Sequence, residues 1–155
     1  MDHVARTSPE GIQADVAAAA AYLRSPAGGS RTSIFTVGFC FGGRNSWLAG
    51  AGGHDLAGAI GFYGMPGVRN GMPGPTARAA AMRAPILAIQ AGADAHITEQ
   101  DNRAFDEALS AAGVEHEIVT VEGAPHSFFD RHHAEFQADS EDAWRRVLAF
   151  IDAHS

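Results

Sequence analysis

Cysteine is almost absent from this sequence, because only Cys40 among its 155 residues is a cysteine. A single cysteine excludes an internal disulfide framework, which fits the reducing cytoplasm. We therefore expect a cytoplasmic protein. Long apolar runs are also missing, since no stretch approaches the roughly 18 uninterrupted apolar residues of a membrane span. The start of the chain, Met1 to Arg6, lacks the apolar segment of a signal peptide.

Positive charge is scarce as well. The chain has 11 Lys and Arg residues against 18 Asp and Glu residues, for a formal net charge of -7. No basic patch stands out, which argues against a nucleic acid or an anionic membrane surface as partner. The length and the 46% hydrophobic composition suit one globular domain over residues 1–155, with residues 1–9 as a flexible lead-in.

Strand-like and helix-like segments alternate along the chain. Apolar runs predict strands at residues 34–39, 56–63 and 85–90, and residues 115–121 are predicted as the fourth strand. Helical spacing of apolar residues and turn signals predict helices at residues 10–23, 44–51, 76–82, 99–112 and 140–154. In the last helix we expect Ser140 as the N-cap residue. Its apolar face would consist of Trp144, Val147, Leu148 and Ile151. This alternation predicts a three-layer α/β domain with a mainly parallel sheet of about four strands.

The segment Gly38-Phe39-Cys40-Phe41-Gly42-Gly43 joins the first predicted strand to the next helix. A nucleophile elbow needs this order of strand, sharp turn and helix, and it needs small residues beside the nucleophile. Gly38 and Gly42 stand at those flanking positions, and Cys40 stands at the position of the nucleophile. The backbone N–H of Phe41 is then correctly placed to donate to an oxyanion.

Two further residues follow predicted strands at their carboxyl ends, where open α/β sheets build their sites. Asp94 follows the third strand and His126 the fourth, so the chain order is nucleophile, acid, histidine, as in α/β-hydrolases. His126 could take the thiol proton from Cys40 and return one to the leaving group. Asp94 could hold the imidazole in the required tautomer.

Each of these residues also has a structural interpretation. Cys40 could be a small buried hydrophobic residue, Asp94 a turn or N-cap residue, and His126 an exposed loop residue. His96 is a rival histidine, but it lies two residues from Asp94 in the same loop. The pair at positions 132–133, with His126, suggests a metal, yet no known zinc motif accompanies these histidines. The joint placement of three residue types favours the catalytic interpretation.

Several stretches together resemble the dienelactone hydrolases, the carboxymethylenebutenolidase-like branch of the α/β-hydrolases. The matching stretches are Gly38-Phe39-Cys40-Phe41-Gly42-Gly43, Phe62-Tyr63-Gly64, Gly92-Ala93-Asp94-Ala95-His96-Ile97 and Pro125-His126-Ser127-Phe128-Phe129. A cysteine in the elbow is uncommon among α/β-hydrolases and typical of this family. The resemblance extends from about Gln13 to the end of the chain.

The resemblance implies hydrolysis of an enol-lactone or related ester, without a metal or organic cofactor. It implies Cys40 as nucleophile, Asp94 as acid and His126 as base. Tyr63 would lie near the substrate. Arg131 is a candidate for binding a substrate carboxylate, although its offset from His126 departs from the family's pattern.

Members of the family are longer, and the part without a counterpart here is N-terminal. The early strands and the loop that gives a second oxyanion N–H would be absent. The first predicted strand would then have an open apolar edge, which favours pairing with another chain. We therefore expect a homodimer or larger assembly that covers this edge.

Two other functions stay open. A shortened hydrolase-like domain could serve as an interaction module without useful catalysis, although an intact set of three catalytic residue types argues against that. A redox role for Cys40 alone has no supporting C-x-x-C motif.

Overall fold

The computed structural model describes residues 7–155 and contains one sheet of four parallel strands in the order β1-β2-β3-β4. The strands are β1 (Phe35–Phe39), β2 (Gly58–Phe62), β3 (Ile86–Ala91) and β4 (His116–Val121). Each lies within about two residues of its predicted range. The prediction of a parallel α/β sheet is confirmed.

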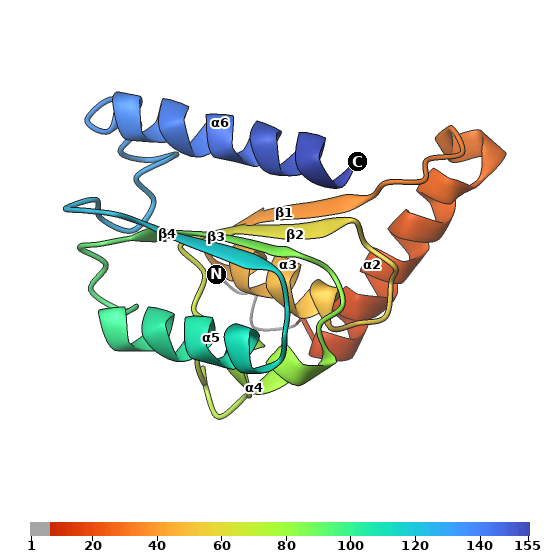
Figure 1. Ribbon diagram of the computed structural model, residues 1–155, viewed down its shortest axis with the longest axis horizontal. Coiled ribbons are helices and arrows are strands. Elements are labelled where there is room, and N and C mark those ends of the chain that lie inside the picture. Colours follow the sequence, from red (N-terminus) through yellow and green to blue (C-terminus); the bar gives the residue numbers. More distant parts are fainter. Residues whose placement is uncertain (1–6) are drawn as a thin grey trace.

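Helices cover both faces of this sheet (Figure 1). The helices are α2 (Pro9–Arg24), α3 (Phe41–Gly50), α4 (Pro75–Arg78), α5 (Glu99–Ala111) and α6 (Gln137–His154), with short 3-10 turns at Pro26–Gly28 and Ala79–Ala81. Helix α6 lies on one face of the sheet, and α3 and α5 lie on the other. These are the three layers that the alternating pattern predicts.

The core consists of two clusters, one on each face of the sheet. Every residue of β2 and β3 is buried, which explains their uninterrupted apolar sequences. Beneath α6 the buried residues include Ile60, Phe62, Leu87, Ile89, Val147 and Phe150. Beneath α3 and α5 they include Trp47, Ala59, Ile86, Ala88, Phe105 and Leu109.

The last helix begins earlier than predicted. Helix α6 starts at Gln137 after the N-cap residue Phe136, and the cap makes no side-chain hydrogen bond. The predicted N-cap, Ser140, is instead a buried residue of the first turn whose backbone N–H donates to Phe136 O at 2.9 Å. The N-cap prediction was wrong because a run of turns from His126 leads directly into the helix.

The buried face of α6 also differs from the prediction. Ala143, Val147 and Phe150 face the sheet, whereas Trp144 is 43% exposed and Leu148 is 47% exposed.

Strand β1 has β2 on one side and, within residues 7–155, no strand on the other. Its Val37 is 52% exposed. The predicted open apolar edge is therefore present.

The N-terminal helix follows its predicted boundaries closely. Ser8 caps α2 by accepting a hydrogen bond from Gly11 N at 3.0 Å, and Pro9 is the first helical residue. The remainder of the expected lead-in, residues 1–6, lies outside the described residues. None of the helices in the described part of the chain is long and apolar enough to cross a membrane.

Candidate active site

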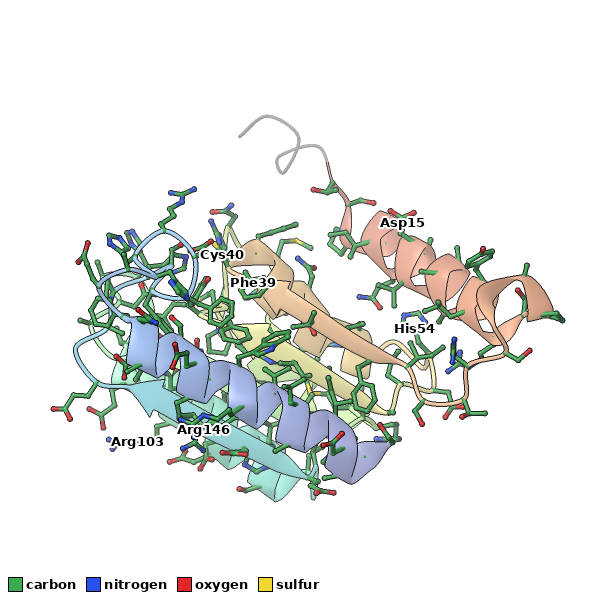
Figure 2. All side chains as sticks on the ribbon, turned by 90° about the horizontal axis from the view of Figure 1, so that it is seen from above. Asp15, Phe39, Cys40, His54, Arg103 and Arg146 are labelled. Atoms are coloured by element: carbon green, nitrogen blue, oxygen red, sulfur yellow. The ribbon has the colours of Figure 1, made fainter. Side chains whose placement is uncertain are left out.

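Four residues of interest follow the four strands in turn, at the same end of the sheet. Cys40 follows β1, Tyr63 follows β2, Asp94 lies in the loop after β3, and His126 lies in the loop after β4. In Figure 2, Cys40 and Phe39 lie at the end of the sheet where α6 begins. The carboxyl ends of parallel strands thus bring residues from distant parts of the sequence to one place.

Cys40 occupies a strained turn between β1 and α3. Its φ and ψ are 54° and -114°, a conformation that side-chain-bearing residues rarely adopt. Its N–H donates to Phe62 O at 2.9 Å, which holds the turn against the end of β2. Strain of this kind, on the order of 1–3 kcal/mol, is typical of functional positions. The predicted order of strand, sharp turn and helix around Cys40 is confirmed, and its role as nucleophile stays a prediction.

The glycines of the elbow do not all act as predicted. A Cβ on Gly38 would lie 2.1 Å from Gly42 O, and a Cβ on Gly43 would lie 2.6 Å from Phe62 O. A Cβ on Gly42 would meet nothing within 4 Å. The need for a small residue therefore falls on Gly38 and Gly43, and the prediction for Gly42 was wrong. The carbonyl of Gly42, rather than its Cα, is what approaches β1.

Asp94 and His126 form a direct hydrogen bond. His126 Nδ1 lies 2.5 Å from Asp94 Oδ2, and the Asp94 side chain is fully buried. The other carboxylate oxygen accepts the backbone N–H groups of His96 at 2.9 Å and Ile97 at 3.3 Å. Asp94 is therefore fixed by three donors, and it pairs with His126 rather than with the side chain of the rival His96.

This bond determines which nitrogen of His126 is free. Because the carboxylate accepts a hydrogen bond, Nδ1 of His126 carries a hydrogen, which leaves Nε2 of the neutral ring as an acceptor. The His126 side chain is 32% exposed, so the free nitrogen lies in an accessible region. Cys40 makes no hydrogen bond to His126 in the described structure. Cys40 packs against the core cluster that contains Tyr63, and the Tyr63 ring lies 5.0 Å from that of His126.

Tyr63 packs between the elbow and the His126 loop. Its ring centroid is 5.0 Å from that of His126 and 5.8 Å from that of Phe128. Burial, followed by the negative charge of the nearby Asp130 carboxylate, raises the pKa of Tyr63 above its ordinary value. Tyr63 thus follows β2 at the same end of the sheet as Cys40, and its predicted place near a substrate stays a prediction.

Phe41 and Arg131 lie at the edges of the site. Phe41 is the first residue of α3, and an N–H group in the first turn of a helix has no partner within that helix. The Arg131 side chain is exposed, and its charge acts on Tyr63 in the direction that lowers its pKa. Phe41 therefore adjoins Cys40, and the predicted roles of Phe41 and Arg131 stay predictions.

Sequence reasoning missed the structural role of Arg44. This buried guanidinium donates to four carbonyl oxygens of the loop after β2: Met65, Gly67, Met72 and Pro73, at 2.5 to 3.1 Å. Burial and the nearby Arg69 lower the pKa of Arg44. A cation in the first turn of a helix is unfavourable beside the positive end of the helix dipole. The position of Arg44 in the sequence was therefore a signal that its side chain has a separate role.

The histidine pair at positions 132–133 does not join a metal-binding group. His132 Nδ1 lies 3.6 Å from Glu135 Oε1. Within residues 7–155, no three side chains of His, Cys, Asp or Glu are arranged to hold a metal ion.

An apolar cavity of about 720 Å³ lies beside the site, over the end of β1. It is lined by Phe39, Phe129, His133, Ser140, Glu141, Trp144 and Arg145. Phe39 stacks on Phe62 with ring centroids 4.8 Å apart and on Phe129 at 5.5 Å. The cavity therefore adjoins both the elbow and the His126 loop.

The chain is similar in sequence and in fold to known proteins. The model of the Dienelactone hydrolase family matches residues 1–155. The "Putative carboxymethylenebutenolidase" of Escherichia coli (strain K12) is 32% identical over 152 residues, which cover 96% of this chain and 56% of that protein. The protein of the same name from Methylorubrum extorquens is 29% identical over 140 residues, covering 88% of this chain and 48% of that protein.

Solved structures give the same result. The crystal structure of a "Putative Dienelactone Hydrolase" from Klebsiella pneumoniae superposes with a TM-score of 0.86 at 28% identity, covering 96% of this chain and 63% of that one. The chain spans about half the length of the curated relatives it matches, so the predicted shortness is confirmed. By the match of its whole length to one family model, the chain belongs to the dienelactone hydrolase family.

Proposed function

We propose that the protein hydrolyses an ester or an enol-lactone of the dienelactone type, with Cys40 as nucleophile, His126 as base and Asp94 as the acid that orients His126. Membership of the dienelactone hydrolase family supports the class of reaction. We place this reaction in the cytoplasm, where a single free cysteine stays reduced.

The observation that carries the proposal is the hydrogen bond of 2.5 Å between His126 and the fully buried Asp94, at the same end of the sheet as the strained Cys40. A structural aspartate or an exposed loop histidine needs no such partner. A nucleophilic site needs a base that is held in one tautomer by a third group. The bond between Asp94 and His126 supports the base and its orienting group, and the position of Cys40 at the same end of the sheet supports the nucleophile.

The reaction follows from these positions. His126 Nε2 takes the thiol proton of Cys40, and the thiolate attacks the carbonyl carbon of the ester. The positive end of the α3 dipole favours negative charge at this point. The Phe41 N–H donates to the developing oxyanion, and His126 returns its proton to the departing alcohol. Water, activated by His126, then cleaves the thioester.

Tyr63 and Arg131 complete the proposed site. Tyr63 forms a wall beside the thiol, and Arg131 is the cation available to a substrate carboxylate. Arg44 is excluded from that role because its guanidinium is already bound by four backbone carbonyls. Binding of a substrate that carries a carboxylate would therefore depend on Arg131.

The experiment that tests the proposal is hydrolysis of p-nitrophenyl acetate before and after alkylation with iodoacetamide. Because Cys40 is the only cysteine, alkylation modifies one known thiol. We expect turnover by the untreated protein and its loss in proportion to the alkylated fraction. Turnover that survives complete alkylation, or a folded protein without turnover, would contradict the proposal, and the latter result would favour an interaction module.

We also propose that a second copy of the chain covers the open edge of β1. The support is the exposed Val37 and Phe39, together with Trp144 and Leu148 on the adjacent face of α6. Such an apolar surface is typical of an interaction site. Light scattering coupled to size exclusion should give a dimer for the wild type and a monomer for Val37→Asp. A monodisperse wild-type monomer at micromolar concentration would contradict this proposal.

A further inference from the structure

Tyr63 has a buried hydroxyl that lacks a hydrogen-bond partner of standard geometry within residues 7–155. Only 1% of the residue is exposed. Buried polar groups without partners are rare in folded proteins, because their desolvation is not compensated. Burying this hydroxyl therefore costs free energy that a phenylalanine at the same position would not incur.

The backbone places this tyrosine next to the candidate nucleophile. Phe39 of β1 pairs in register with Phe62 of β2, so Cys40 and Tyr63 are the next residues across the sheet. Both have positive φ, 54° for Cys40 and 35° for Tyr63. The chain therefore turns sharply directly after each of the two paired residues, Phe39 and Phe62. Strained residues at two neighbouring positions point to a functional requirement rather than to packing.

The surroundings of Tyr63 keep its hydroxyl protonated. Burial, the Asp130 carboxylate and the charge of Cys40 all raise the pKa of Tyr63, and only Arg131 acts in the opposite direction. At neutral pH the hydroxyl is therefore a hydrogen-bond donor. The Tyr63 ring also packs on the candidate base, with its centroid 5.0 Å from that of His126.

The elbow by itself supplies one donor, the Phe41 N–H, whereas efficient acyl transfer uses two or more donors aimed at the oxyanion. We propose that the Tyr63 hydroxyl is a second donor of the oxyanion hole for the tetrahedral intermediate formed on Cys40. This inference rests on the proposed hydrolase function and assigns to Tyr63 a catalytic role within it.

The role concerns one step. The thiolate of Cys40 forms a bond to the carbonyl carbon, and the π electrons of the C=O bond move to oxygen. Tyr63 and Phe41 donate hydrogen bonds to that oxygen, and no proton is transferred to it. When the C=O bond forms again, the C–O bond to the alcohol breaks, and the alkoxide takes the proton that His126 holds. Alkylation of Cys40 by iodoacetamide displaces iodide and forms no oxyanion.

This difference gives a direct test. Mass spectrometry would measure two rates on the same protein: acetylation of Cys40 by p-nitrophenyl acetate and its alkylation by iodoacetamide. Tyr63→Phe removes the hydroxyl but keeps the ring that packs on His126. Tyr22→Phe is the matched control, since Tyr22 is the other tyrosine of the chain and is 59% exposed on α2. Because the removed hydroxyl has no partner, Tyr63→Phe should fold normally, as circular dichroism would verify.

For Tyr63→Phe we expect the ratio of acetylation rate to alkylation rate to fall by about 10²–10³-fold, the usual effect of losing one oxyanion donor. For Tyr22→Phe the ratio should not change. An unchanged ratio in Tyr63→Phe would overturn the oxyanion role. An equal fall of both rates would also overturn it, because it would show that Tyr63 acts on the reactivity of the thiol. A wild-type protein that is alkylated but never acetylated would instead refute the proposed hydrolase function.

Discussion

Asp94→Asn is expected to lower kcat for ester hydrolysis about 10⁴-fold, the size of the loss that the same change causes in a serine-protease triad. The reason lies in the fixed orientation of the side chain. Asp94 Oδ1 accepts two backbone N–H groups, from His96 and Ile97. An asparagine must keep its carbonyl oxygen at that position and direct its NH₂ group toward His126 Nδ1.

The consequence for His126 is a change of tautomer. With a donor facing Nδ1, the neutral ring must carry its hydrogen on Nε2, and it can no longer take the thiol proton. The fold should be retained, because the asparagine keeps the shape of the aspartate. Asp106→Asn is the matched control: Asp106 lies on α5 and pairs with His116 at 3.2 Å, away from the elbow. A loss below tenfold in steady-state kinetics would show that Asp94 does not act through His126.

Gly38→Ala is expected to destabilise the protein by roughly 3–5 kcal/mol, within the range of the most severe single substitutions. The new Cβ would lie 2.1 Å from Gly42 O and 2.3 Å from Gly42 C, and both distances are shorter than Cβ atoms in proteins show. Helix α3 would have to move away from β1, which would displace Cys40 and remove activity. Because the obstacle is backbone, a change of side-chain rotamer cannot relieve it.

Gly42→Ala is the matched control for this prediction. Nothing lies within 4 Å of its Cβ position, and its φ is outside the left-handed range. Within a helix, alanine should be favourable by up to about 1 kcal/mol relative to glycine. Thermal unfolding would measure both, since each kcal/mol shifts the Tm of a chain of this size by about 2–4 °C. A similar loss of Tm in the two variants would contradict the close-approach explanation.

The two glycines illustrate what the sequence could predict. The spacing around Cys40 correctly indicates a strand, a sharp turn and a helix, because each element has a local signal in the chain. Which glycine is sterically required depends on how closely α3 approaches β1 and β2. That distance follows from packing, and no residue pattern encodes it.

Asp94 and His126 could be identified for a related reason. Each follows a predicted strand, and the rule that sites form at the carboxyl ends of parallel strands places them together. Their direct bond and the burial of the Asp94 carboxylate needed the structure, because the course of the two loops has no local signal in the chain.

The faces of α6 and the role of Arg44 could not be predicted from periodicity. Trp144 and Leu148 have the same helical spacing as Val147 and Ile151, so the sequence offers two apolar faces and only the position of the sheet selects one. The four acceptors of Arg44 lie in a Gly- and Pro-rich loop whose course has no periodic signal. Tertiary contacts decide both cases.

The central claim is that Cys40 forms a covalent acyl intermediate with an ester substrate. The most direct measurement is mass spectrometry of protein quenched during turnover of p-nitrophenyl acetate. We predict one acetyl group on the peptide that contains Cys40. In the wild type this group should be lost again on incubation. In His126→Ala, acylated by a high concentration of the ester, the group should persist. Turnover without any acetyl group on Cys40, or with the group on another residue, would contradict the account.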